Sequence, residues 1–287
     1  MPLTFTDTPL YYKDSQGSYQ RILSGADMTG YRTAAAQDVI DAELLPIVNN
    51  AGAHNSIYRG KYLGAEVTAA QYEAIDAGTF EDLYIGDYWT INNVNWRIAA
   101  FDYWLHCGDT ECTKHHLVMI PETCLYNAKM NDSNIVTGAY IGSLMYTTNL
   151  ANAKTAIDTA FGSAHILKHR EQLANAVTEH RETGHAWVDS KVEIMNESMV
   201  YGTERFHNQM QGNAWAEYHT IDKTQLAIFR LDPTKIVAFY NNARASWWLR
   251  DVVNSTGFAY VYATGNADLC NASGSLGVRP AFGIFGS

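Results

Sequence analysis

The sequence predicts an α+β domain, in which short helices pack beside mixed sheets, on three observations. Apolar runs of strand length recur along the chain and end with 277–284. Helix start and stop signals bracket two segments, 68–78 and 148–162. Adjacent Trp247 and Trp248 lie in an extended run, where neighbouring side chains point to opposite faces of a sheet. Each tryptophan therefore needs its own apolar cover, which layers of helix and sheet provide.

Residues 1–58 are predicted to be an N-terminal arm followed by an assembly helix. The arm is polar and aromatic with little periodicity, which is typical of a segment that becomes ordered against a partner. The helix starts at Thr33 and is disturbed at Pro46. Its narrow apolar stripe fits a seam between subunits and packing on its own domain equally well. The Asn-rich stretch 49–55 is the best linker candidate, and a second domain follows over 59–287.

The second domain opens with a short helix and three predicted strands. A capping box at Thr68 begins the helix, which ends at Gly78. Two alternating runs, 79–91 and 94–101, flank an Asn-Asn turn and predict a hairpin. The run 117–121 predicts a further strand.

The middle of the chain alternates helix and strand signals. A helix is expected from Thr148 to a stop at Gly162, with Leu150, Ile157 and Phe161 on one face. After it we expect a second helix or helix-like segment over 166–177, and then a strand and a helix start over 187–199. A long surface insertion is expected over 201–218. Two buried strands are expected at 225–229 and 236–240, around an Asp232-Pro233 turn.

Composition excludes several classes of protein. A formal charge of -10 opposes contact with phosphate backbones, so we expect no nucleic-acid role. No apolar run approaches the length of a membrane span, and no leader pattern opens the chain, so we expect no membrane insertion. The chain's 4 cysteines are too few and too irregular for a disulfide framework, which suits synthesis in reducing cytosol.

One cluster, 106–116, has metal-ligand residue types, with His106, Cys107, Cys112 and His115 among them. Zinc sites take close Cys and His pairs from two separated places, whereas here one patch supplies everything. A polar loop before the strand at 117–121 is favoured over a structural metal, and no metal or other cofactor is predicted.

A polar stretch lies between two apolar blocks at the end of the chain. It is rich in Tyr, Ser, Asn and Gly, the composition of antibody-like binding loops, although composition alone favours an ordinary polar loop region. One short strand is expected from Phe258, Ala259 and Val261, with Tyr260 and Tyr262 on its opposite face. Glycines are expected at the turns, and these are Gly257, Gly265, Gly274 and Gly277.

The blocks around this stretch, Trp247 to Arg250 and Gly277 to Phe282, resemble the C-terminal variable region of diversity-generating retroelement target proteins from phages and prophages. A Gly-Asp-Tyr-Trp motif at Gly86 extends the resemblance back to about Arg59. The resemblance implies a C-type-lectin-like domain of the formylglycine-generating-enzyme type. In that family template adenines are randomised, so Lys, Glu, Gln, Met and Trp are not reached; all five are absent from 249–287.

The resemblance implies a receptor-binding protein that is made in the bacterial cytoplasm and lies at the tail tip or surface of a virion. Its expected partner is a host cell-surface protein or glycan. Residues 1–58 are expected to contact other virion proteins and to support a homo-oligomer, because weak sites gain from multivalency. The resemblance implies a trimer, since trimers occur among such tail proteins. The variable region covers about 242–276. The expected ligand-binding residues are Asn242, Arg244, Ser246, Asp251, Asn254, Ser255, Thr256, Tyr260, Tyr262, Thr264, Asn266, Asp268, Asn271 and Ser273.

Enzyme signatures are absent from the sequence, so no catalytic residue and no enzyme activity are predicted. Two carboxylate pairs, Glu81 with Asp87 and Asp189 with Glu193, suit a tail-associated glycan hydrolase only if they converge, and solvated surface positions are favoured. A structural virion component and a cell-surface adhesin are further alternatives.

Overall fold

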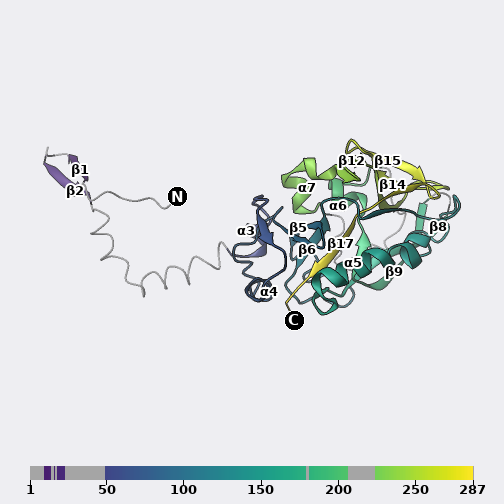
Figure 1. The fold of residues 1–287 in the computed structure, drawn as a ribbon, viewed down its shortest axis with the longest axis horizontal. Coiled ribbons are helices and arrows are strands. Elements are labelled where there is room, and N and C mark those ends of the chain that lie inside the picture. The colour runs from purple at the N-terminus through teal and green to yellow at the C-terminus, as the bar shows by residue number, and fades with distance from the viewer. Residues whose placement is uncertain are drawn as a thin grey trace. The chain divides into compact units, whose positions relative to one another are not determined.

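The computed structural model describes residues 10–13, 16, 18–22, 49–178, 181–205 and 224–286. The chain divides into two compact units, 1–49 and 50–287 (Figure 1). In the first unit, β1 (Leu10–Lys13) and β2 (Tyr19–Ile22) pair as an antiparallel hairpin within the predicted arm. The helix predicted from Thr33 to residue 47 and most of the insertion predicted over 201–218 lie outside the described residues.

The larger unit begins at Asn50, with helix α3 (Ala51–His54) inside the stretch predicted to be a linker. His54 is buried, its Nδ1 is hydrogen-bonded to the carbonyl oxygen of Leu83, and its ring stacks on Tyr84 at 4.9 Å. These contacts attach the start of the unit to its core. The division between the units, after Asn49, lies at the start of the stretch 49–55 that is predicted to be the linker.

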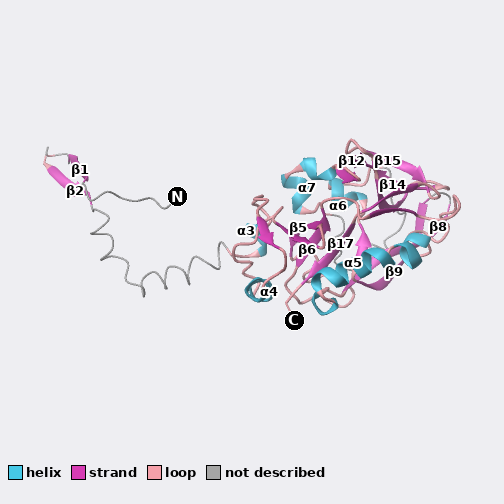
Figure 2. Cartoon of the chain, in the orientation of Figure 1, coloured by secondary structure: helices cyan, strands magenta, loops and turns pink. Residues whose placement is uncertain are grey.

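Strands and loops make up most of the larger unit, and its helices are short (Figure 2), which confirms the α+β class. A six-stranded sheet has the order β10-β17-β6-β5-β4-β3. Its strands are β3 (Tyr62–Gly64), β4 (Tyr88–Ile91), β5 (Val94–Phe101), β6 (Leu117–Pro121), β10 (Val192–Ile194) and β17 (Pro280–Ile284).

A five-stranded sheet has the order β15-β14-β13-β16-β7, and two separate hairpins accompany it. The sheet contains β7 (Tyr126–Lys129), β13 (Trp247–Val252), β14 (Gly257–Val261), β15 (Ala267–Asn271) and β16 (Ser275–Val278). The hairpins are β8 (His169–Thr178) with β9 (Arg181–Ser190) and β11 (Ala238–Tyr240) with β12 (Ala243–Ala245).

The remaining helices are short and cap the sheets. They are α4 (Ala69–Asp76), a π-helix (Met145–Asn149) that runs into α5 (Ala151–Phe161), a 3-10 helix (Ser163–His165), α6 (Glu197–Tyr201), α7 (Ala227–Leu231) and a second 3-10 helix (Pro233–Ile236). No helix in the described part of the chain has the length and apolarity needed to cross a membrane.

The structure confirms three predicted helix caps and turns, each of which depends on residues close together in the sequence. Thr68 and Gln71 form the predicted capping box of α4. The Asn92-Asn93 turn joins β4 to β5, and both residues have positive φ, as a tight hairpin turn requires. Helix α5 ends at Gly162, whose φ of 80° no longer continues the helix.

Two predicted elements are wrong. The helix predicted over 166–177 is the strand β8, which pairs with β9 from His169↔Ser190 to Thr178↔Arg181. The strand predicted at 225–229 is largely the helix α7. The segment 225–229 is a short apolar run, and 166–177 mixes apolar with charged residues. In neither segment does the local pattern decide between helix and strand, so their partners elsewhere in the chain decide.

Trp247 and Trp248 are each fully buried, on opposite faces of β13, as predicted. Trp247 belongs to the larger core, which joins the six-stranded sheet to one face of the five-stranded sheet. Trp248 belongs to a smaller core with Met145, Leu150 and Leu173, from the π-helix, its junction with α5, and β8. The five-stranded sheet is therefore packed on both faces.

A buried polar network lies beside the smaller core. Arg250 of β13 pairs with Glu171 of β8 at 2.6 Å, and both side chains are buried. Nearby, Glu193 accepts hydrogen bonds from Tyr140 Oη at 2.7 Å and Ser190 Oγ at 3.3 Å. Burial, reinforced by the charge of Glu171, raises the pKa of Glu193 to about 7.

Replacing Trp248 tests the dependence of the fold on the smaller core. We expect Trp248→Ala to lower the free energy of unfolding by about 3–5 kcal/mol, because it leaves a cavity and removes the bond from Trp248 Nε1 to Ala128 O. Tyr262→Ala, at a side chain that is 46% exposed, should cost no more than about 1 kcal/mol. Urea denaturation measures both, and equal losses contradict the expectation.

The raised pKa of Glu193 predicts a pH dependence of stability. The folded state holds this proton to about pH 7, whereas the unfolded carboxyl ionises near its ordinary pKa of 4.5, so stability falls as pH rises through that window. Relative to Glu193→Gln, the unmodified chain should lose on the order of 2 kcal/mol between pH 5 and pH 8. Urea denaturation at both pH values measures this, and parallel stability curves would show that Glu193 is not the titrating group.

Candidate ligand-binding site

Four of the fourteen predicted ligand-binding residues lie in strands β13, β14 and β15, and most of the others lie in the turns that connect these strands to their neighbours. Tyr260 of β14 lies opposite Trp248 of β13 and Asp268 of β15. Phe258 lies on the same face as Tyr260, so the prediction that placed them on opposite faces is wrong; Ala259 and Val261 occupy the other face, in the larger core. Within β14, Tyr260 is therefore the side chain that reaches the surface, and the exposed residues lie in the turns beyond the two ends of the strand.

Most of the fourteen predicted residues reach solvent. The exposed ones are Asn242, Arg244, Ser255, Tyr262, Thr264, Asn266, Asp268 and Asn271. The half-buried ones are Ser246, Asn254, Thr256, Tyr260 and Ser273. Asp251 is buried, and its Oδ2 accepts a hydrogen bond from the backbone N–H of Glu197 at 2.7 Å at the start of α6. Asp251 is therefore a structural residue and not part of an exposed surface.

Four of these residues form a group at one end of β14, here called the Asn254 cluster: Asn254, Thr256, Asn271 and Ser273. Thr256 Oγ1 lies 3.2 Å from Asn254 Oδ1 and 3.0 Å from Asn271 Oδ1. The backbone N–H of Ser273 donates to Asn134 Oδ1. These bonds hold two turns together, so the cluster has an internal structural role.

A second group lies at the other end of β14, about 13 Å away at roughly 3.3 Å per residue. We call it the polar face, and it consists of Arg244, Tyr262, Thr264, Asn266 and Asp268. The Tyr260 and Tyr262 rings meet edge to face at 6.3 Å, and Tyr260 Oη donates to Asp268 Oδ2 at 3.2 Å. Burial and the adjacent carboxylate raise the pKa of Tyr260 to about 12.

The turn within the polar face is anchored by the rest of the unit. Gly265 has a φ of 94°, which a glycine adopts without strain, and its N–H donates to Tyr262 O at 2.7 Å. Tyr201 Oη of α6 donates to Gly265 O at 3.1 Å. Of the four glycines expected at turns, Gly265 and Gly274 lie in turns, whereas Gly257 and Gly277 lie inside strands against Cys270 and Cys124.

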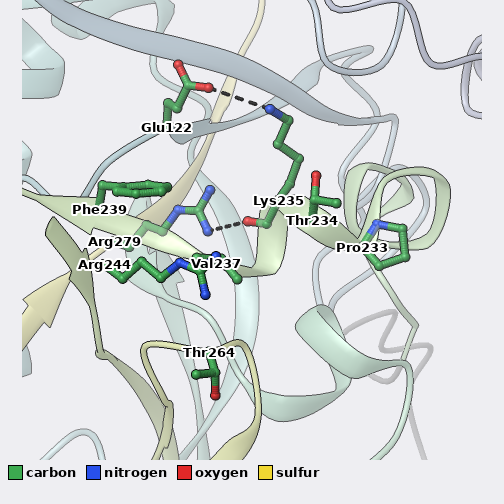
Figure 3. A pocket seen from close by; sticks show the side chains of 9 residues that line it. All are labelled: Glu122, Pro233, Thr234, Lys235, Val237, Phe239, Arg244, Thr264 and Arg279. Atoms are coloured by element: carbon green, nitrogen blue, oxygen red, sulfur yellow. Dashed lines mark hydrogen bonds and ion pairs between the residues drawn. The ribbon is translucent and has the colours of Figure 1, made fainter. Parts of the chain in front are cut away.

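A pocket of about 570 Å³ opens beside the polar face (Figure 3). Arg244 and Thr264 belong to both. The other lining residues come from the 3-10 helix at Pro233, from β11 and from the segments after β6 and β16. The complete lining is Glu122, Pro233, Thr234, Lys235, Val237, Phe239, Arg244, Thr264 and Arg279. Such a volume is within the range of small-molecule sites.

Arg279 is the buried charge of the pocket. Its side chain donates from Nε to Pro121 O at 3.0 Å and from Nη1 to Lys235 O at 2.8 Å. Desolvation lowers the pKa of Arg279 to about 10, which still leaves the guanidinium charged at neutral pH. Across the pocket, Lys235 Nζ lies 3.6 Å from Glu122 Oε1.

Sequence reasoning missed Glu122, Lys235 and Phe239 as pocket residues, because segments far apart in the chain bring them together. The sequence pattern assigns Arg279 to the apolar block at the end of the chain, together with its neighbours, and not to a site. A charged residue within a run of buried residues was the available signal, since buried arginine is rare without a specific partner or role.

The other predicted candidates make internal contacts. Among the described residues, no group of three or more His, Cys, Asp and Glu side chains is arranged to hold a metal. In the 106–116 cluster, buried His116 accepts a hydrogen bond from Trp104 N–H through Nε2, and burial lowers its pKa to about 3. Asp87 pairs with Arg59 at 2.6 Å, and Asp189 pairs with Lys168 at 2.9 Å.

Comparison with known proteins gives one match. Residues 185–285 match the model of DUF6273, a domain of unknown function. No curated protein and no solved structure is matched by the chain. The matched region covers less than half of the chain, but it contains the Asn254 cluster, the polar face, and every pocket residue except Glu122.

Proposed function

We propose that this chain is a ligand-binding protein whose polar face contacts a molecule on a host cell surface. One observation carries the proposal: the polar face is attached to a completely buried aromatic and aliphatic frame in strands β13, β14, β16 and β17. Changes to exposed side chains on such a frame leave the packing intact. The frame residues are Trp247, Trp248, Phe258, Val278 and Phe282, all 0% exposed.

The composition of the polar face supports recognition rather than catalysis. Tyr262 offers a large, rigid contact area at low entropic cost, and Thr264 and Asn266 offer adaptable hydrogen-bonding groups. Arg244 adds a forked donor group. Together these side chains suit a host protein or glycan that presents hydroxyl, amide or acidic groups.

The resemblance of the Trp247–Arg250 and Gly277–Phe282 blocks to retroelement target proteins extends the proposal. In this extended form, the larger unit is C-type-lectin-like and residues 242–276 are diversified. The chain belongs to a phage or prophage virion, at the tail tip, and forms a homo-oligomer through its N-terminal region, with other virion proteins as partners. The buried residues on both sides of 242–276 support this extended proposal, since diversification requires a fold that tolerates changes at its surface.

Single substitutions on the polar face should change ligand choice without unfolding the chain. Tyr262→Ser and Asn266→Ser should each shift binding to individual members of a panel of bacterial surface polysaccharides by at least about tenfold, or about 1.4 kcal/mol. Biolayer interferometry on the oligomeric protein measures this.

Tyr62→Ser is the matched control for Tyr262→Ser. Tyr62 is 52% exposed and its ring lies 5.6 Å from that of Tyr88, much as Tyr262 contacts Tyr260, but it lies on the edge of the six-stranded sheet. We expect unchanged binding. If Tyr62→Ser alters binding as much as Tyr262→Ser, or no polysaccharide or host cell is bound, a solvated structural role is the better account.

The encoding locus gives an independent test of diversification. We expect a second, non-coding copy of the segment for residues 242–276 beside a reverse-transcriptase gene, differing mainly at template adenines. Sequencing the flanking DNA in several related phages decides this. A locus with neither feature removes the retroelement part of the proposal and leaves ligand binding standing.

A further inference from the structure

The pocket beside the polar face holds an excess of positive charge in an otherwise acidic protein. Lys235, Arg244 and Arg279 are basic, whereas Glu122 is the one acidic residue of the lining. The chain as a whole has a formal charge of -10. A local concentration of cations against that background creates a site with its own electrostatic preference.

The single carboxylate of the pocket is already engaged. Glu122 Oε1 lies 2.6 Å from Arg97 Nη2 and 3.6 Å from Lys235 Nζ, and Glu122 Oε2 accepts from Asn95 Nδ2 at 2.8 Å. Burial raises the pKa of Glu122, but these neighbours outweigh burial and hold the pKa below its ordinary value. The carboxylate is therefore charged. It makes its ion pairs with Arg97 and Lys235, and it acts on Arg279 only from a longer distance.

Arg279 and Arg244 make no ion pair within the described residues. Arg279 is 1% exposed, and the acceptors it has are two neutral backbone carbonyls. Its guanidinium also lies over the Trp247 ring at 5.1 Å. A buried cation without a direct ion-pair partner costs stability, and an anion that enters the pocket offsets that cost.

The remaining lining suits the body of a small organic molecule. Phe239 is 42% exposed and, with Val237 and Pro233, supplies apolar surface. Thr264 supplies a hydroxyl at the rim, where the pocket meets the polar face. Figure 3 shows the Arg244 and Arg279 side chains near Phe239 and Val237. Thr264 is set apart from them, on the side of Arg244 that faces away from Arg279.

We infer that this pocket binds the carboxylate or phosphate group of an acidic saccharide, through Arg244 and Arg279. The guanidinium fork matches both oxyanions in a bidentate geometry, whereas neutral sugars offer no such partner. Phe239 and Val237 contact the sugar ring. The inference rests on the proposed ligand-binding function and specifies the chemical class that the surface selects.

Isothermal titration calorimetry of the full chain at low salt tests the inference with four probes: glucuronate, glucose 6-phosphate, glucose and inorganic phosphate. We expect one or both sugar acids to bind at least about tenfold more tightly than glucose, and the comparison between them identifies the acidic group. Equal binding of glucose and both sugar acids, or binding of inorganic phosphate alone, overturns the inference.

Arg244→Ala is the decisive variant because Arg244 is exposed and the fold does not require its charge. It should weaken the preferred sugar acid by at least about tenfold, whereas Arg244→Lys should retain part of the affinity because it keeps the charge without the fork. Lys191→Ala removes one exposed positive charge elsewhere and should leave affinity unchanged. Equal losses from Arg244→Ala and Lys191→Ala would indicate long-range charge alone and reject the pocket.

A second readout uses stability. The preferred sugar acid should raise the melting temperature of the unmodified chain and not that of Arg244→Ala, because a ligand that binds only the folded state stabilises it. If polysaccharides bind through Tyr262 but Arg244→Ala affects no acidic ligand, the proposed function stands and this inference fails. If the sugar acids bind but no polysaccharide or cell does, the pocket stands without the proposed function.

Discussion

The structure depends on the burial of two neighbouring tryptophans on opposite faces of β13. A sheet with one wet face buries one of two adjacent side chains, so β13 has apolar layers on both sides. Each indole also has its own acceptor, Ile236 O for Trp247 and Ala128 O for Trp248. The larger core and the smaller core follow from this requirement, and they fix β14 and β16 on either side of β13.

The same arrangement explains where the polar residues lie. With both faces of the sheet covered, side chains reach solvent at turns, on the edge strand β15, and on the separate β11–β12 hairpin. The polar face and the pocket occupy these positions. Arg279 lies between β16 and β17, the two strands that connect the sheets, so its charge is held by backbone geometry that both cores stabilise.

Much of the fold could be predicted from sequence where short-range chemistry decides it. The capping box at Thr68, the stop at Gly162 and the Asn92-Asn93 turn each satisfy backbone requirements within a few residues. The helix predicted over 166–177 is wrong because this segment forms strand β8 through pairing with β9, and the local pattern does not show that pairing. The polar composition of the stretch predicted that most of its side chains would be exposed, whereas the pocket depends on Glu122 and Lys235, which no local pattern relates to Arg244.

Strands β16 and β17 follow each other in sequence but occupy interior positions in different sheets, β16 between β13 and β7 and β17 between β10 and β6. Until residues 275–284 are available, the hydrogen-bonding edges of four strands remain open. Ribosomal synthesis therefore delivers residues 275–284 after the strands whose edges they close. A nascent chain that ends before residue 275 leaves both sheets open, and such unpaired strand edges make an incomplete chain prone to aggregation.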